Sequence, residues 1–222
     1  MQIEPAAPPW TGPSVNAVRP HLDAPFAELY ECGLFGGWDS SPPVSMEQHY
    51  WPARSTRSQY RRQVPSRDSQ GELHGNGARR FGAARLPKNP GEVARWHAGV
   101  DLGGEHLDMV VACQSGTVAE IITFHLGTWA MMVQNDCNAL VFSYNEIQAG
   151  SWKEFNIKKG SKVVAGQPLA RIGLMNGKSS MLHFEIYQTG TTRTHGWKQA
   201  GSRPGVLRDP TKYLLYVAAC GA

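Results

Sequence analysis

The sequence lacks several features that are typical of common classes of protein. None of its apolar runs approaches the length needed to cross a membrane, so we expect no transmembrane helix. It has four cysteines, at Cys32, Cys113, Cys137 and Cys220. They are far apart and form no CxxC pair, which argues against a zinc ribbon and a dense disulfide framework. The formal net charge of the 222 residues is only +4, which is too small to indicate nucleic-acid binding by itself.

The start of the sequence also lacks the pattern of a secretory signal peptide. The stretch MQIEPAAPPWTGPSV contains no basic segment followed by an apolar run. We therefore expect synthesis in the cytoplasm without a signal peptide. Any work outside the cytoplasm would then depend on delivery by another system.

Glycine and proline are plentiful, with 24 and 15 residues, and this content argues against a helical bundle. From about residue 95 onward, short runs rich in valine and isoleucine are separated by glycine, asparagine and aspartate. We therefore predict a mainly β fold of antiparallel strands with few short helices. One such helix is predicted in DPTKYLLYVAA near the C-terminus, with Asp209 as its N-cap and Pro210 in its first position.

Residues 1–78 differ in composition from the rest, being rich in proline, serine, arginine and glutamine. They predict a long, irregular N-terminal extension, followed by one domain at residues 79–222. Three roles are open for the extension: a loading segment for delivery, a segment that occludes a site, or a layer wrapped around the core. We interpret its arginine-rich stretch as a solvated loop, and a cationic surface for an anionic polymer is the alternative.

The stretch MLHFEIY at residues 181–187 has the alternation of a β-strand. Because alternate side chains of a strand share a face, we expect one face to pack on the core through Leu182, Phe184 and Ile186. The other face holds Met181, His183, Glu185 and Tyr187. A single histidine on such a face is ordinarily a surface residue, so a function for His183 requires a second signal.

That second signal is the segment HAGVDLGG, in which His97 and Asp101 are four residues apart. In a straight strand they would lie about 13 Å apart, too far to share a metal ion bound at ~2 Å from each ligand atom. If both bind one ion, the chain must bend between them, and Gly99 is the residue that permits the bend.

Several motifs in order resemble the M23 (lysostaphin-type) family of zinc metallopeptidases. They are HAGVDLGG, VVACQSGTVAEI and IKKGSKVVAGQPLARIGLMNGKSSMLHFEI, and the similarity covers roughly residues 79–190. The resemblance implies an antiparallel β-sheet groove with a Zn²⁺ ion on its floor. It also implies that the zinc ligands are His97, Asp101 and His183, and that the substrate is the peptide part of peptidoglycan, its stems or cross-bridges.

The sequence departs from this family at both of its usual catalytic histidines. Met181 stands where the family has the first histidine of an HxH motif. In FSYNEI, Tyr144 stands in the place of the other histidine, and an alternative register puts Glu146 there.

These replacements matter because hydrolysis of a peptide bond requires proton transfer as well as a metal. Three protein ligands with an open fourth position are typical of a catalytic zinc. The candidate catalytic residues are Tyr144, which could donate a hydrogen bond to an oxyanion, and Glu185. Glu185 could act as a base or orient a ligand, and we favour the orienting role. His125 and His195, in predicted loops, are further candidates for recruitment.

We therefore predict a zinc-binding domain directed at peptidoglycan peptides, with weak or absent amide hydrolysis and a binding or regulatory role. The alternative is an active zinc endopeptidase that cleaves cross-links with non-standard acid and base residues. On either view we expect action in the periplasm or cell wall after delivery, as an effector or phage component. A delivery, immunity or regulatory protein would be a partner, and nucleic acid is not expected to be one.

Overall fold

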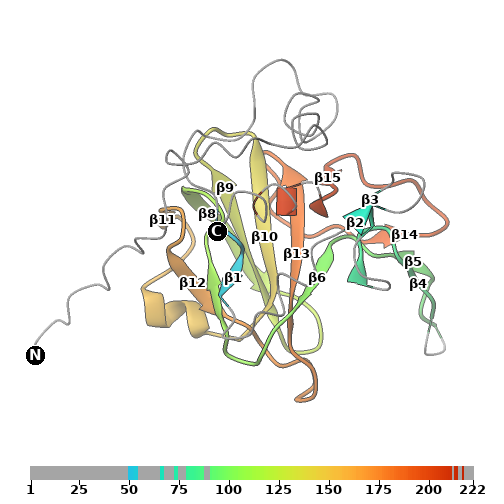
Figure 1. Ribbon diagram of the computed structural model, residues 1–222, viewed down its shortest axis with the longest axis horizontal. Helices are drawn as coiled ribbons and strands as arrows, with labels where there is room; N and C mark the ends of the chain where they lie inside the picture. The colour runs from blue at the N-terminus through green and yellow to red at the C-terminus, as the bar shows by residue number, and fades with distance from the viewer. Residues whose placement is uncertain are drawn as a thin grey trace, which may run out of the picture.

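The computed structural model describes residues 50–54, 66–67, 73–74, 79–87, 91–211, 213–214 and 217. Within this part of the chain the fold is mainly antiparallel β, as the sequence predicts (Figure 1). Most of the predicted N-terminal extension, residues 1–78, lies outside the described residues, so its role stays a prediction.

The central sheet has seven strands. They are β6 (Val100–Gly103), β8 (Gly116–Thr123), β9 (Trp129–Asn135), β10 (Leu140–Ile147), β11 (Lys162–Val163), β13 (Met181–Gln188) and β15 (Leu207–Arg208). Their order is β11-β8-β9-β10-β13-β15, and β6 pairs with β13 beyond this path. Figure 1 shows β8, β9, β10 and β13 side by side in the middle of the molecule. All the pairings are antiparallel.

A second sheet packs on one face of the central one and closes the core. It consists of β1 (Ala53–Arg54), β7 (Met109–Val111) and β12 (Pro168–Arg171), in the order β1-β7-β12. Val110 and Leu169 of this sheet belong to the same buried apolar cluster as Phe142 and Phe184 of the central sheet. Burial of this cluster is the main force that holds the two sheets together.

Two smaller sheets complete the β structure. One consists of β4 (Ala84–Arg85), β5 (Arg95–Trp96) and β14 (Trp197–Lys198), and the other of β2 (Ser66–Arg67) and β3 (Leu73–His74). In Figure 1 the sheet of β4, β5 and β14 lies beyond β6 and β13, at one side of the molecule. Because His97 directly follows β5, this sheet also positions the start of the HAGVDLGG segment.

Helical structure is sparse in the described residues. A 3₁₀ helix, η4, spans Ser151–Phe155, and residues 211, 213, 214 and 217 are α-helical. The Thr211 N–H donates to Asp209 Oδ1 at 2.8 Å, and Leu214 and Val217 are buried in the core. The predicted C-terminal helix and its Asp209 cap are therefore confirmed. None of the helices in the described part is long and apolar enough to cross a lipid bilayer.

The predicted alternation of β13 is confirmed. Leu182, Phe184 and Ile186 belong to the main core cluster, and His183 points to the other face, opposite Asp101 of β6. His183 is nevertheless buried, with 6% of its surface exposed. It is therefore not an ordinary surface histidine, and its ring must have polar partners inside the protein.

Candidate functional site

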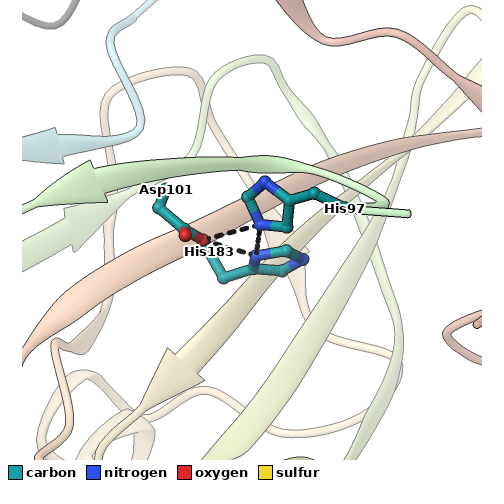
Figure 2. Close-up of side chains that lie close together, drawn as sticks. All are labelled: His97, Asp101 and His183. Atoms are coloured by element: carbon teal, nitrogen blue, oxygen red, sulfur yellow. Dashed lines mark hydrogen bonds and ion pairs between the residues drawn. The ribbon is translucent and has the colours of Figure 1, made fainter. Parts of the chain in front are cut away.

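Three polar side chains converge on one point at the edge of the central sheet (Figure 2). His183 of β13 and Asp101 of β6 are direct partners in the antiparallel pairing, and His183 Nδ1 lies 2.8 Å from Asp101 Oδ1. His97 Nε2 lies 2.9 Å from the same oxygen and 3.0 Å from His183 Nδ1. The three residues form a group whose atoms could hold one metal ion.

The chain bends between His97 and Asp101, as the shared-ion hypothesis requires. The reason for glycine at position 99 is close packing, because its φ lies outside the left-handed region. A Cβ atom at Gly99 would lie 2.5 Å from the Phe184 carbonyl oxygen and 2.9 Å from His183 Nε2. Only glycine lets the HAGVDLGG segment approach β13 closely enough to bring the three side chains together.

Each of the three side chains is held by a partner on the side that faces away from the common point. The His97 Nδ1–H donates to the Arg80 carbonyl oxygen at 2.8 Å, which leaves Nε2 directed at the cluster. The His183 Nε2–H donates to Glu185 Oε1 at 3.0 Å, which leaves Nδ1 directed there. The Arg85 guanidinium donates to Asp101 Oδ2 at 2.6 Å. Such outer partners fix the tautomer and orientation of metal ligands.

Glu185 is itself fixed by a buried hydrogen-bond network. Its Oε2 accepts from the Tyr187 hydroxyl at 2.8 Å and from Asn145 Nδ2 at 2.9 Å. The Ser143 hydroxyl in turn donates to Asn145 Oδ1 at 2.7 Å. Both oxygens of Glu185 are therefore engaged, and the geometry supports the role of orienting His183 over that of a base.

The electrostatics of the cluster show what kind of ligand it suits. Burial alone would lower the pKa of His183, but hydrogen bonds and charges from Asp101 and Glu185 raise it to about 10. Burial would raise the pKa of Asp101, but hydrogen bonds from the two histidines hold it well below its usual range. Burial lowers the pKa of His97. The two carboxylates thus favour a positive charge between them, and a divalent cation could take the place of the proton on His183.

The cluster lies in the wall of a cavity of about 1270 Å³. The lining includes the side chains of His97, Asp101 and His183, and several aromatic residues, among them Trp96, Phe124 and Trp197. An ion held by the three residues would therefore have a side open to a molecule in the cavity. This arrangement is typical of a catalytic rather than a closed structural metal site.

The structure places Tyr144, one of the two predicted catalytic residues, in the core rather than at the cavity. Tyr144 of β10 lies opposite Phe184, so its ring packs in the core on the face away from His183. Its fully buried hydroxyl accepts the Cys113 N–H at 2.7 Å. Burial and the neighbouring Cys113 raise the pKa of Tyr144 well above its usual value. Tyr144 does not line the cavity, and its contacts are those of a core residue.

Glu146, the alternative residue at this position, does line the cavity. A β-bulge interrupts the pairing of β10 with β9 between Asn145 and Ile147, and Glu146 has a φ of 66° there. Burial raises the pKa of Glu146 to about 7, with Asp101 and Glu185 adding to the increase. A carboxyl group with a pKa near neutrality is typical of general acid–base catalysis.

The other predicted candidates also line the cavity. Met181 stands at the start of β13, while His125 and His195 come from the loops that precede β9 and β14. The His195 backbone N–H donates to the Tyr187 hydroxyl at 2.9 Å, which ties its loop to the network around Glu185. Burial lowers the pKa of both His125 and His195.

Sequence reasoning missed the residues that hold the ligands in place, apart from Glu185. Arg80 contributes only a backbone carbonyl, and Arg85 and Asn145 belong to no motif that carries chemistry. The available signal for Asn145 was its place beside Tyr144 on a strand expected to pair with the histidine strand. Its face could not be assigned before the register of that pairing was known.

The sequence model of peptidase family M23 matches residues 95–194, the region that contains His97, Asp101 and His183, so this part of the chain is similar to that family. The family is generally zinc-dependent. A search of curated proteins found no match.

Solved structures of similar fold include lysostaphin and LytU. The solution structure of lysostaphin is 21% identical, with a TM-score of 0.44, over 62% of this chain and 49% of lysostaphin. The present chain thus spans about half the length of that protein. The catalytic domain of lysostaphin from Staphylococcus simulans is 21% identical, with a TM-score of 0.42, over 61% of this chain and 88% of that domain. LytU is 23% identical, with a TM-score of 0.40, over 59% of this chain and 88% of LytU.

Proposed function

We propose that this domain binds Zn²⁺ through His97, Asp101 and His183 and hydrolyses amide bonds in the peptide part of peptidoglycan. The observation that carries the proposal is the convergence of three ligand atoms, 2.8–3.0 Å apart, in the wall of an open cavity. The same cluster buried away from any cavity would support a structural metal instead.

The donor set fits zinc. Two imidazole nitrogens and one carboxylate oxygen are ligands that zinc commonly takes, and the site has no thiolate that would favour a softer metal. Each ligand also has an outer partner: the Arg80 carbonyl, Arg85 or Glu185. These partners hold the donor atoms in place before an ion arrives, which reduces the cost of binding it.

A zinc ion supplies two effects when it is bound: it lowers the pKa of a water molecule and polarises a carbonyl group. The residues of the chain then have two tasks of their own. The cavity must hold an extended peptide with its scissile bond at the cluster, and a side chain must carry protons. The volume of about 1270 Å³ and the aromatic residues of the lining suit the first task.

The similarity of residues 95–194 to family M23 supports a peptide of the bacterial cell wall as the substrate. Peptide stems and cross-bridges are both compatible with the cavity, and the aromatic side chains Trp96 and Trp197 offer surfaces on which a peptide backbone can pack. The choice between stem and bridge depends on loops that line the cavity, and it is part of the test below.

A binding or regulatory role with weak or absent hydrolysis is a second candidate. It is favoured by Met181, whose thioether lines the cavity and cannot transfer a proton. In this case the domain would hold zinc and bind muropeptides without cleaving them.

One experiment separates the two roles. Purified full-length protein, loaded with zinc, is incubated with muropeptides that differ in stem and cross-bridge, and new amino termini are detected by mass spectrometry. His183→Ala serves as the control, and zinc content is measured for both proteins. Cleavage by the zinc-loaded protein alone supports hydrolysis, and retention of intact muropeptides supports the binding role. If the purified protein takes up no zinc, both proposals are wrong.

A further inference from the structure

Glu146 is a buried acidic residue. It is not part of the cluster of His97, Asp101 and His183, so that cluster does not explain why a carboxyl group is buried at this position. Only 6% of its surface is exposed, yet it lines the same cavity as His97 and His183. Its Oε2 is buried and has no hydrogen-bond partner within the described part of the chain. Buried carboxylate oxygens nearly always have partners, so an oxygen without one requires an explanation.

The backbone shows that this placement is built into the fold. Asn145 lies opposite His183, and the β-bulge that follows adds one residue to β10. Without the bulge, Glu146 would share the core face of Tyr144. With it, Ile147 takes its place in the apolar cluster and Glu146 lines the cavity. The left-handed φ of 66° costs free energy for a residue other than glycine, and such strain concentrates at functional positions.

A hydrogen bond from a neighbouring segment holds the bulge in place. The Gly173 N–H donates to the Glu146 carbonyl oxygen at 2.7 Å. A Cβ at Gly173 would lie 2.9 Å from this oxygen, so the two chain segments are in close contact. The direction of the Glu146 side chain is therefore set by packing of the surrounding backbone.

The other buried carboxylates that line the cavity, Asp101 and Glu185, already have partners for both of their oxygens. Asp101 Oδ1 lies within the cluster, and its Oδ2 accepts from Arg85. Both oxygens of Glu185 accept hydrogen bonds. Glu146 is also not a member of the group of converging ligand atoms, so it faces the cavity beside the cluster rather than within it. A group in that position is available to a molecule that the cavity holds.

We propose that Glu146 is the proton carrier of this domain, in the role that the replaced histidines would otherwise have. The inference deepens the proposed hydrolysis and depends on it. The oxygen of a water molecule attacks the amide carbonyl carbon, and the Glu146 carboxylate takes a proton from that water. The same proton then passes to the amide nitrogen as the carbon–nitrogen bond breaks. The products are a carboxylic acid, which keeps the second proton of the water, and an amine. The acid then passes this proton to the amine, and Glu146 is already ionised again because its own proton went to the nitrogen.

The test compares the wild-type chain with Glu146→Gln, which keeps the size of the side chain and removes its basicity. Zinc content is expected to stay at the wild-type stoichiometry, while the turnover rate falls by about 10²–10⁴-fold. Glu146→His, which restores a base, is expected to recover part of the rate. Glu154→Gln is the matched control, because Glu154 is exposed and paired with Arg171, and it should change nothing.

A second readout does not depend on turnover. Acetohydroxamate gives up a proton when it chelates a metal, and a neighbouring base stabilises the complex by accepting that proton. In the cobalt-substituted protein, visible absorption measures the affinity for acetohydroxamate. We expect this affinity to fall at least tenfold in Glu146→Gln and to stay unchanged in Glu154→Gln. If the wild-type protein hydrolyses nothing, the proposed hydrolysis fails, and a weaker acetohydroxamate complex in Glu146→Gln still supports Glu146 as the base. Unchanged acetohydroxamate affinity, wild-type turnover in Glu146→Gln, or loss of zinc from that variant would each overturn the inference.

Discussion

His183 and Asp101 are direct partners across two antiparallel strands, and His183 Nδ1 lies 2.8 Å from Asp101 Oδ1. Side chains that lie directly opposite in such a pair point to the same face of the sheet. The pairing of β13 with β6 therefore brings together residues that are 82 positions apart in the chain. His97 then needs only the short bend at Gly99 to reach both of them.

Replacing His183 by alanine should abolish stoichiometric zinc binding. Removing a residue that only supports a ligand typically lowers metal affinity by about 10–100-fold. His183→Ala removes a ligand itself, so its loss of zinc affinity should be larger. His195→Ala is the control, since His195 lines the cavity but lies outside the cluster. Competition with a chromogenic chelator measures both affinities, and equal values for the two variants would contradict the assignment of His183.

Replacing Glu185 by glutamine should weaken zinc binding by about 10–100-fold without abolishing it. The amide can still accept the His183 Nε2–H, but it lacks the charge that makes the imidazole a stronger ligand. The amide nitrogen would also replace Oε2, which now accepts hydrogen bonds from Asn145 and Tyr187, and a nitrogen that donates cannot accept them. The same chelator competition measures the change, with Glu154→Gln as the exposed control. An affinity equal to that of the wild type would show that Glu185 does not support the metal site.

Replacing Gly99 by alanine should lower both stability and zinc affinity. The new methyl group would meet the Phe184 carbonyl oxygen at 2.5 Å, and a backbone atom cannot move aside cheaply. We expect a loss of about 1–3 kcal/mol in the free energy of unfolding. Gly205→Ala is the matched control, because no atom lies within 4 Å of its new Cβ. Urea unfolding with and without zinc measures the effect, and equal stability of the two variants would refute the packing argument.

Replacing Tyr144 by phenylalanine should affect stability and leave the metal site intact. The change removes the acceptor of the buried Cys113 N–H, which should cost about 1–3 kcal/mol. Zinc content and any muropeptide cleavage should stay at wild-type levels, because the hydroxyl lies on the core face of β10. Thermal unfolding and zinc analysis of the same preparation measure both quantities. Lost turnover at unchanged stability would restore Tyr144 as a catalytic residue.

The two cysteines in the described part of the chain should differ in reactivity. Burial raises the pKa of Cys113 to about 12, so below that pH its thiol is neutral, buried and unreactive. Cys137 is exposed and should be labelled in the native protein. Iodoacetamide treatment at pH 8, followed by peptide mass spectrometry, distinguishes the two positions. Native labelling of Cys113 at the rate of Cys137 would mean that the core opens readily there.

Local pattern was sufficient to predict part of this molecule. Alternation in MLHFEIY placed Leu182 and Phe184 in the core and His183 on the opposite face, as observed. The C-terminal helix followed from its Asp209 cap, a signal contained within a few residues. Both predictions succeed because the physical cause, strand period or cap geometry, acts between residues that are close in the sequence.

The resemblance left two residues open for the place of the replaced histidine, Tyr144 and Glu146. Strict alternation along β10 would put both on one face, and the bulge after Asn145 separates them, so that Glu146 alone lines the cavity. A bulge depends on the neighbouring strand and on the contact with Gly173, so the residues of β10 alone do not reveal it.

The sequence by itself thus determined the antiparallel β architecture and the need for a bend at Gly99 if His97 and Asp101 share an ion. Both follow from composition and short-range backbone geometry, while the candidate ligands followed from the resemblance of the motifs to a known family. Only the tertiary structure decided that Glu146 rather than Tyr144 lines the cavity, and which residues hydrogen-bond to the far side of the candidate ligands. Those answers depend on strand register and on contacts such as Arg85 with Asp101, which join segments that no local pattern connects.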